Sequence, residues 1–521
     1  MNHKKLHASL VVLVMTLTPL LSAARADGPL SDRIAAVTDA PNYKHAHWGI
    51  LVVDLKSGET IYELNADKLF VPASTTKLFS TSAAWDAFGP DHRFETPVVR
   101  RGDVDAAGLL HGDLILVASG DLTIGGRTNA DGQIAFKDSD HTYANGNETA
   151  EVTEPDPLAG LNDLARQVAA AGVKRVSGNV LIDDRLFETA EGTGSGPSRL
   201  TPIVVNDNVI DFVVTPGAAD EAAAVRWRPE TATIRVDARV DTIERGGSTR
   251  VNVTSAGSGR LIVRGQIAAG HKPLVRVHEV ENAASFARSL FIEALERAGV
   301  VVDASPLGVN RSESLPAPGE CASLPRVALL TSPPFSESIK LILKVSHNLH
   351  ASTLPLLVAS KNGKRTLGEG LRLQHDFLAR AGVDVDTISF GGGAGGSRAD
   401  YTTPRATVQL LRYMAARSDF DRYEAALPVL GVDGTLASSV PADSPARGHV
   451  HAKTGTLYWD NVMNDRVLLT SKALAGTMTT AAGRRLALAM FVNNTHLDKT
   501  SETIREGKTL GRLCEVIYEA E

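Results

Sequence analysis

The hydrophobic pattern near the start of the chain predicts a β-hairpin followed by a helix. Two runs of strand-forming residues, 48–55 and 60–64, flank a turn-forming segment at residues 56–59, which is typical of a hairpin. Residues 72–88 then predict a helix that ends before Gly89, since glycine commonly follows the last helical turn. This part of the chain therefore supplies paired strands and a largely apolar helix.

Helices and strands mix again in the last third of the chain. Residues 336–359 are helical in pattern, with a break expected between Ser346 and Pro355. Thr403 is followed by a proline, which is typical of a helix cap and first helical position. The other expected elements are a helix continuing to about residue 417, strands at 473–480 and 485–493, and a terminal helix at 504–518.

The middle of the chain predicts a β-rich module. Short strand-like runs, separated by Gly, Ser and Asp turns, recur between residue 96 and about residue 308. They include residues 209–214, 233–240, 250–253 and 274–280. A polar stretch at 138–157 predicts a mobile surface loop. The tripeptide Ala-Gly-Val at 171–173, 298–300 and 381–383 predicts three helices that end at a left-handed glycine and pass into strands.

Composition bounds the class of protein. A chain of 521 residues is too long for one core, so two or three domains are expected. Hydrophobic residues make up 43% and charged residues 22% of it, as in ordinary globular proteins. The 54 Lys and Arg against 60 Asp and Glu give a formal charge of -6. That balance provides no general attraction to nucleic acid or anionic lipid, so neither is an expected partner.

The first 26 residues predict a secretory signal peptide. They combine two lysines, an apolar stretch shorter than a membrane span, and the cleavage-type sequence Ala24-Arg25-Ala26. We therefore expect an exported, periplasmic protein with no transmembrane segment after cleavage. Cys321 and Cys514 are too few for a disulfide scaffold or a cysteine-based zinc site. In an oxidising compartment they could form one disulfide or remain two buried thiols.

Candidate chemistry begins at Ser74 and Lys77, at the start of the predicted helix 72–88. A spacing of three residues places both side chains on one helix face, and the unpaired N–H groups of the helix start point toward whatever the serine attacks. Lysine can activate serine only as a neutral amine, which burial and a second ammonium group both favour. Taken alone, this motif could equally be an exposed serine and lysine.

Two further motifs are weak one at a time. Ser346 and Asn348 lie on the loop that follows an apolar helix, where both could face one cleft or simply cap a helix. Lys453, Thr454, Gly455 and Thr456 lie on a predicted strand. A side-chain-free glycine lets another backbone approach, and an exposed strand edge can pair with a peptide ligand.

Together these motifs, in the order S-x-x-K, S-x-N and K-T-G, are the signature of active-site serine penicillin-recognising enzymes. The chain resembles the D-alanyl-D-alanine carboxypeptidase/endopeptidase family of class C low-molecular-mass penicillin-binding proteins. Members carry a large insert between the first two motifs, and here about half of the chain separates Lys77 from Ser346. Residues 72–78, 112–121, 427–435, 453–457 and 475–477 match the family pattern.

The resemblance implies the fold and the domain organisation. Residues 27–96 and 317–521 would form an α/β (α+β) penicillin-binding domain of the serine β-lactamase-like transpeptidase type. Residues 97–316 would form a β-rich insertion of one or two extra domains, nested within it. The implied activity is hydrolysis of D-Ala-D-Ala ends, or of cross-links, in peptidoglycan stem peptides through an acyl-serine, with β-lactam antibiotics as inhibitors.

The resemblance also implies a role for each motif residue. The catalytic set would be Ser74, Lys77, Ser346, Asn348 and Lys453, with Ser346 passing a proton to the leaving amine and Asn348 holding the peptide. The substrate-binding set would be Thr454, Gly455 and Thr456, with the two threonines binding the terminal carboxylate. The N–H groups of Ser74 and Thr456 would form the oxyanion hole, whose individual donors are typically worth about 3–4 kcal/mol of barrier.

The chain departs from the family at three places. His347 stands where the family usually has Asp, Ser352 where Glu is common, and residues 392–397 replace a more polar loop. A serine β-lactamase and a non-catalytic wall-binding homologue therefore remain alternatives. No cofactor or metal is expected, because none of the 15 histidines forms a known metal-binding spacing.

Overall fold

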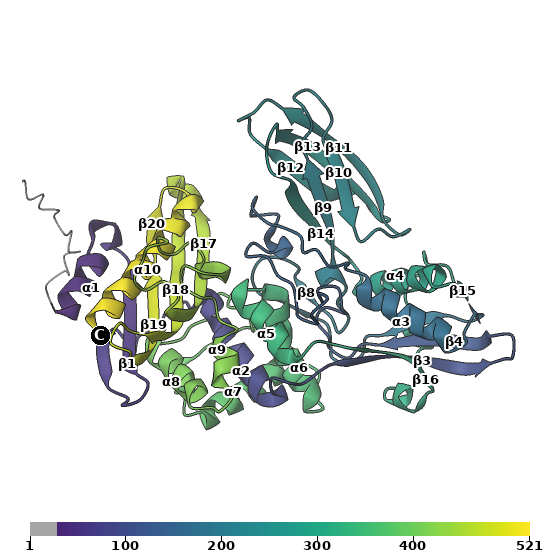
Figure 1. Ribbon diagram of the computed structural model, residues 1–521, viewed down its shortest axis with the longest axis horizontal. Coiled ribbons are helices and arrows are strands. Elements are labelled where there is room, and N and C mark those ends of the chain that lie inside the picture. Colours follow the sequence, from purple (N-terminus) through teal and green to yellow (C-terminus); the bar gives the residue numbers. More distant parts are fainter. Residues whose placement is uncertain (1–28) are drawn as a thin grey trace, which may run out of the picture.

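The computed structural model describes residues 29–521, so the predicted signal peptide lies outside the described part of the chain. The first and the last of the described segments lie in one lobe, whereas the middle segments extend away from it (Figure 1). None of the described helices has the length and apolar character needed to cross a membrane.

A six-stranded antiparallel sheet forms the centre of the first lobe. The strand order is β17-β18-β19-β1-β2, and β20 pairs with β18. The sheet is buried on both faces because alternate β1 residues enter different cores: Ile50 and Val52 in one, Leu51 and Val53 in the other. The strands are β1 (His47–Asp54), β2 (Thr60–Leu64), β17 (Val450–Asn461), β18 (Arg466–Thr479), β19 (Arg485–Asn493) and β20 (Thr495–Leu497).

Helices cover both faces of this sheet. On one face, α1 (Leu30–Thr38) packs against α10 (Thr503–Ala520). On the other face, α2 (Thr76–Phe88) has every residue from Thr76 to Trp85 buried, so it forms the centre of a helical layer. The other helices of that layer are α5 (Phe335–Lys344), α6 (Asn348–Lys361), α7 (Leu367–Arg380), α8 (Pro404–Ala415) and α9 (Phe420–Glu424).

The middle of the chain forms further sheets. Helices α3 (Ala159–Ala170) and α4 (Ala283–Arg297) pack together, beside a sheet of order β15-β5-β4-β3-β16 in which β6 also pairs with β4. Two three-stranded sheets, β10-β9-β14 and β11-β13-β12, lie above them in Figure 1, and β7 pairs with β8. The strands are β3 (Glu95–Val104), β4 (Leu109–Val117), β5 (Arg175–Val176), β6 (Val180–Asp183), β7 (Ala190–Glu191), β8 (Arg199–Leu200), β9 (Val209–Thr215), β10 (Ala224–Arg228), β11 (Arg235–Ile243), β12 (Arg250–Ser255), β13 (Arg260–Ala268), β14 (Leu274–Glu279), β15 (Val301–Val302) and β16 (Arg326–Thr331).

The α/β fold with a β-rich insertion is confirmed. The expected hairpin, the helix after it, the helix break near Ser346 and the terminal helix are all present. The domain boundaries at residues 97 and 316 stay a prediction, and β16, which follows residue 316, pairs with β3. At the three Ala-Gly-Val sites the glycines adopt left-handed φ values of 89°, 85° and 74°. The third site leads into a short 3-10 turn instead of the expected strand.

The prediction that residues 138–157 form a mobile surface loop holds only in part: the segment is irregular and Asn145, Gly146, Glu148 and Thr149 are exposed, but other positions in it are buried, and its mobility stays a prediction. Asp140, His141, Thr142 and Ala144 are buried, around a short 3-10 turn at His141–Tyr143. Polar composition suggests exposure, but the buried polar groups of this segment form hydrogen bonds and ion pairs with other buried charges. Asp140, for example, receives hydrogen bonds from Arg127 at 2.7 and 3.2 Å.

The two cysteines are free thiols. Both are buried, Cys321 in a small cluster beside β4 and β6, and Cys514 in the core between the central sheet and α10. The sequence left two hypotheses open, one disulfide or two buried thiols, and the structure supports the two separate thiols.

We predict that a thiol reagent titrates two cysteines in the unfolded protein without prior reduction. Burial raises the pKa of Cys514 to about 12, so neither modification nor a redox reaction is expected in the folded state. Reductant should leave the thermal unfolding midpoint unchanged, as measured by circular dichroism. A drop in that midpoint on reduction would contradict the structure.

Candidate active site

The start of α2 brings Ser74 and Lys77 together. Ser74 lies in a single 3-10 turn, Ala73–Thr75, immediately before the helix, and Lys77 is fully buried in the first helical turn. The Lys77 Nζ atom lies 2.8 Å from Ser74 Oγ, 2.7 Å from Asn348 Oδ1 and 2.8 Å from the carbonyl oxygen of Ala394. These three contacts use all of the hydrogen-bonding positions of the amine.

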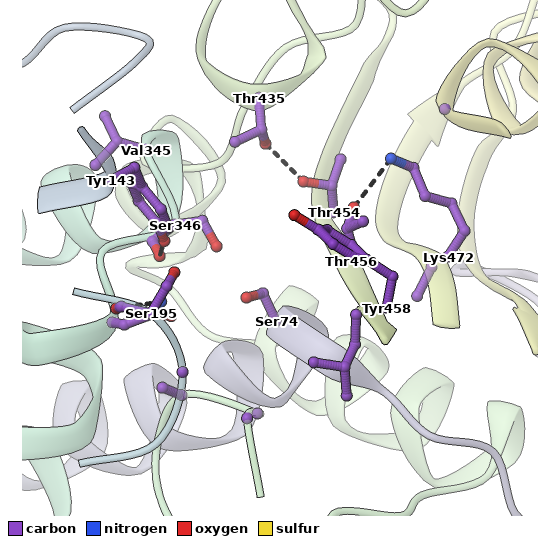
Figure 2. A pocket seen from close by; sticks show the side chains of 18 of the residues that line it. Ser74, Tyr143, Ser195, Val345, Ser346, Thr435, Thr454, Thr456, Tyr458 and Lys472 are labelled. Atoms are coloured by element: carbon purple, nitrogen blue, oxygen red, sulfur yellow. Dashed lines mark hydrogen bonds between the residues drawn. The ribbon is translucent and has the colours of Figure 1, made fainter. Parts of the chain in front are cut away.

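The second motif occupies the turn between α5 and α6. Ser346 has a left-handed φ of 64°, and the hydroxyl of Tyr143 donates a hydrogen bond to its carbonyl oxygen. The Asn348 amide group donates to the carbonyl of Ser195 at 3.0 Å, while its oxygen faces Lys77. In Figure 2 the Ser346 and Ser74 side chains point toward one another across the cleft.

The third motif lies on β17, the edge strand of the central sheet. Lys453 is fully buried and donates to the carbonyl of Thr454 at 2.8 Å. A Cβ atom on Gly455 would lie 2.6 Å from the carbonyl oxygen of Pro72, so only glycine permits this approach of β17 to the start of α2. The glycine therefore places the strand beside Ser74.

The loop at residues 391–397 closes the base of the site. A Cβ atom on Gly395 would lie 1.9 Å from the carbonyl oxygen of Ala73, which leaves no space for a side chain. The Asp400 carboxylate accepts backbone hydrogen bonds from Gly391 and Ser397, both at 2.8 Å, and so fixes the loop. The expected position of this loop near the cleft is confirmed.

Burial lowers the pKa of both motif lysines, and charge repulsion adds to the effect at Lys77. Burial, followed by the positive charge of Lys453, holds the pKa of Lys77 well below its usual range, and Asp400 opposes this effect. Burial lowers the pKa of Lys453 to about 7. At neutral pH the site therefore favours a neutral Lys77 amine.

These residues meet at a cleft of about 670 Å³. Ser74, Ser346, Asn348, Thr454 and Thr456 all line it, together with Tyr458, Trp459 and Lys472 from the same β17–β18 hairpin (Figure 2). Lys77 and Lys453 lie beneath its surface. The structure thus brings together every site residue predicted from sequence, and it adds Tyr143, Ser195, Thr435, Ala394 and Lys472.

Comparison with known proteins identifies the family. The profile of the D-Ala-D-Ala carboxypeptidase 3 (S13) family matches residues 30–510. The chain belongs to this family.

Its relatives are similar over most of their length. A D-alanyl-D-alanine carboxypeptidase of Actinomadura sp. (strain R39) is 29% identical over 82% of this chain and 76% of that protein. The D-alanyl-D-alanine carboxypeptidase DacB of Haemophilus influenzae is 24% identical over 85% of both chains. The solved structure of penicillin binding protein 4 (DacB) from Haemophilus influenzae, complexed with a β-lactam, has a TM-score of 0.66 and 20% identity, covering 95% of this chain and 100% of that one.

A buried charge cluster supports the second motif of this carboxypeptidase. Asp207 accepts hydrogen bonds from Arg127 at 2.6 Å and from His350 at 2.7 Å. Burial disfavours the charged form of His141, but the carboxylates of Asp211 and Asp140 outweigh this effect and raise the pKa of His141 to about 10. Arg228 pairs with Asp211. The cluster thus balances three cations against three carboxylates. The cations are Arg127, His141 and Arg228, the carboxylates are Asp140, Asp207 and Asp211, and the imidazoles of His347 and His350 complete it. The sequence alone gives no signal for it, because its members are scattered between residues 127 and 350.

His347, which replaces the family's usual Asp, caps α6. Its Nδ1 atom accepts a hydrogen bond from the backbone N–H of His350 at 3.3 Å, so an imidazole nitrogen serves as the acceptor that a carboxylate would otherwise provide. Its Nε2 atom lies 3.4 Å from Asp207 Oδ1. An imidazole at this position adds no further carboxylate to the three that the neighbouring cluster already contains.

Asp207, His347 and His350 are also the one group among the described residues whose ligand atoms lie close enough to hold a metal ion. The fit is poor for two reasons. Arg127 and His141 already hold the Asp207 carboxylate. The two imidazole rings stack at 3.8 Å with an interplanar angle of 26°, so their in-plane lone pairs do not converge on one point. No catalytic step is assigned to a metal here.

We predict that the cap, and not a charge, is what position 347 requires. His347→Asn keeps a side-chain acceptor for the cap and should lower stability by about 1 kcal/mol or less. His347→Asp adds a fourth carboxylate beside Asp207 and should cost about 3 kcal/mol. Chemical denaturation of the two variants at pH 7 measures the difference, and equal stabilities would refute this account of the cluster.

Proposed function

We propose that this carboxypeptidase is exported and hydrolyses the D-Ala-D-Ala ends of peptidoglycan stem peptides, and their cross-links, through an acyl-serine intermediate. The observation that carries the proposal is the contact between Ser74 and a buried Lys77 whose other two partners are hydrogen-bond acceptors. Such a lysine is positioned as a base for the serine hydroxyl.

Activation of Ser74 follows from the three contacts of Lys77. In the neutral amine, two N–H groups donate to Asn348 Oδ1 and to the carbonyl of Ala394. The lone pair then faces the Ser74 hydroxyl, 2.8 Å away. An ammonium group would have no lone pair to accept the proton, so the lowered pKa of Lys77 is a condition of the reaction.

The edge of β17 provides a place for the substrate. An extended peptide can pair with this strand as an added strand, which brings its scissile carbonyl to the N–H groups of Ser74 and Thr456. The hydroxyls of Thr454 and Thr456 both line the cleft, and they would receive the terminal carboxylate. The edge position of β17 is what leaves its hydrogen-bonding groups free for a ligand.

The reaction then proceeds in two steps. Ser74 Oγ attacks the scissile carbonyl carbon while its proton passes to Lys77, and the tetrahedral intermediate collapses as a proton reaches the leaving amine through Ser346. The terminal D-alanine departs and leaves an ester on Ser74. Water hydrolyses that ester in the second step, which restores the serine hydroxyl and releases the shortened peptide.

The same serine would be acylated by penicillin, because a β-lactam carbonyl can occupy the place of the scissile peptide. The Haemophilus influenzae structure of the same fold contains a bound β-lactam. A family match across residues 30–510 and the intact motif set favour this function over a β-lactamase and over a non-catalytic wall-binding protein.

We predict that the protein without residues 1–26 releases D-alanine from an N-acyl-D-Ala-D-Ala peptide. Ser74→Ala should reduce release by roughly 10³-fold or more, because the nucleophile is lost. Mass spectrometry after penicillin treatment should find the adduct on the unmodified enzyme and not on Ser74→Ala. Equal release by both proteins would contradict the proposal, and cross-linked muropeptides assayed in parallel measure the share of endopeptidase activity.

We also predict a shift in the pH dependence of acylation when the second cation is removed. Burial lowers the pKa of Lys77 most, and the charge of Lys453 adds to it; Lys453→Met abolishes this repulsion, so Lys77 should stay protonated to higher pH. The acid limb of the penicillin acylation rate should then move to higher pH. Lys453→Arg keeps the charge and should leave that limb in place. The prediction fails if both variants share the unmodified enzyme's acid limb.

A further inference from the structure

A third lysine, Lys472, reaches the cleft from the neighbouring strand. It lies on β18 directly opposite Thr456, and its Nζ atom donates a hydrogen bond to Thr456 Oγ1 at 2.9 Å. Figure 2 shows this contact at the wall of the cleft that also contains Ser74 and Thr454. None of the three sequence motifs includes this residue.

Lys472 is a cation without an anionic partner in the part of the chain that the structure describes. Its side chain forms no ion pair there, and the one side-chain hydrogen bond it makes there is to Thr456. The carboxylate of the nearby Glu506 is already engaged, because Tyr43 donates to one of its oxygens at 2.5 Å and Arg505 to the other at 3.0 Å. An ammonium group has three donors, so two of them remain for a ligand.

The surrounding chain holds Lys472 in this position. A Cβ atom on Gly507 of α10 would lie 3.3 Å from Lys472 Cε, which shows that the lysine stem passes close to the helix. Burial lowers the pKa of Lys472 to about 8, and Glu506 opposes the shift. The group therefore remains largely protonated at pH 7.

Lys472 lies on the face of β17 that carries the two threonine hydroxyls. Alternate residues of a strand face opposite sides, so Thr454 and Thr456 share one face and Lys453 belongs to the other. Lys453 is fully buried beneath the strand, whereas the contact with Thr456 Oγ1 puts Lys472 beside the hydroxyls. Because Thr456 accepts from Lys472, its own proton is free to donate to an anion.

We propose that Lys472 is a further substrate-binding residue, which together with Thr456 binds the terminal carboxylate of the peptide and so selects free carboxyl ends. This inference rests on the proposed function. Its chemistry is a charge-assisted hydrogen bond from an ammonium group to a carboxylate, reinforced by a hydroxyl that the same ammonium group orients. An uncharged C-terminal amide cannot form that ion pair.

The test compares two peptides that differ only at the C-terminus, N-acyl-D-Ala-D-Ala and its C-terminal amide. Lys472→Met should lower kcat/KM for the carboxylate peptide by roughly 10- to 100-fold and change the value for the amide by less than about threefold. Lys472→Arg should recover most of the loss, since it restores the cation. Lys508→Met, which removes an exposed lysine of α10 outside the cleft lining, is the matched charge control and should behave as the unmodified enzyme.

Two results would overturn the inference: no loss for the carboxylate peptide in Lys472→Met, or an equal loss for both peptides. The second would assign Lys472 a purely structural role, and the thermal unfolding midpoint of the variant would then fall as well. Binding to the Ser74→Ala protein, measured by calorimetry with and without Lys472→Met, gives the same comparison without turnover. If the unmodified enzyme released no D-alanine while its Ser74→Ala form still preferred the carboxylate peptide, the proposed function would fail and the role of Lys472 would stand.

Discussion

The desolvation of two lysines is the constraint on which the rest of this structure depends. Keeping a lysine neutral at pH 7 costs about 4.6 kcal/mol relative to its usual pKa, and here the fold supplies the conditions for it. The helix α2 is buried over its first ten residues, and Lys77 and Lys453 are both fully enclosed. The stabilisation gained by the surrounding core must exceed that cost, which explains why Lys77, next to the proposed nucleophile Ser74, is enclosed in a helix whose following residues Leu78 and Phe79 belong to an apolar core cluster.

The two lysines are enclosed because backbone segments around them approach one another closely. Gly455 lets β17 contact the start of α2, and Gly395 lets the loop beneath it contact the same turn. A Cβ atom at either place would overlap a backbone carbonyl oxygen, so any side chain there would force the strand or the loop away from the start of the helix. The acceptors of Lys77 are then rigid groups, a carbonyl and a carboxamide, so little reorganisation is needed as the proton moves.

The sequence predicts the local parts of this arrangement and misses the long-range ones. The motifs at Ser74, Ser346 and Lys453 are recognisable because each is short and lies on a predictable helix start, turn or strand. Lys472 was not predicted, because its place depends on the pairing of β17 with β18, whose register shifts between Leu457 and Tyr458. Residues 138–157 were predicted only in part, since a polar stretch reveals nothing about the buried charges that some of its residues meet in the folded chain.

The inserted segments contribute residues to the site. Tyr143 binds the carbonyl of Ser346, and Ser195 binds the amide of Asn348. Asp207 pairs with the surrounding cations of the buried charge cluster. Its backbone has a left-handed φ of 51°, both neighbouring asparagines are left-handed as well, and such a conformation persists only where its surroundings enforce it. The turn of the second motif therefore takes its geometry from residues far away in the sequence, and a change in the insert can alter the proposed catalytic groups without touching the proposed substrate.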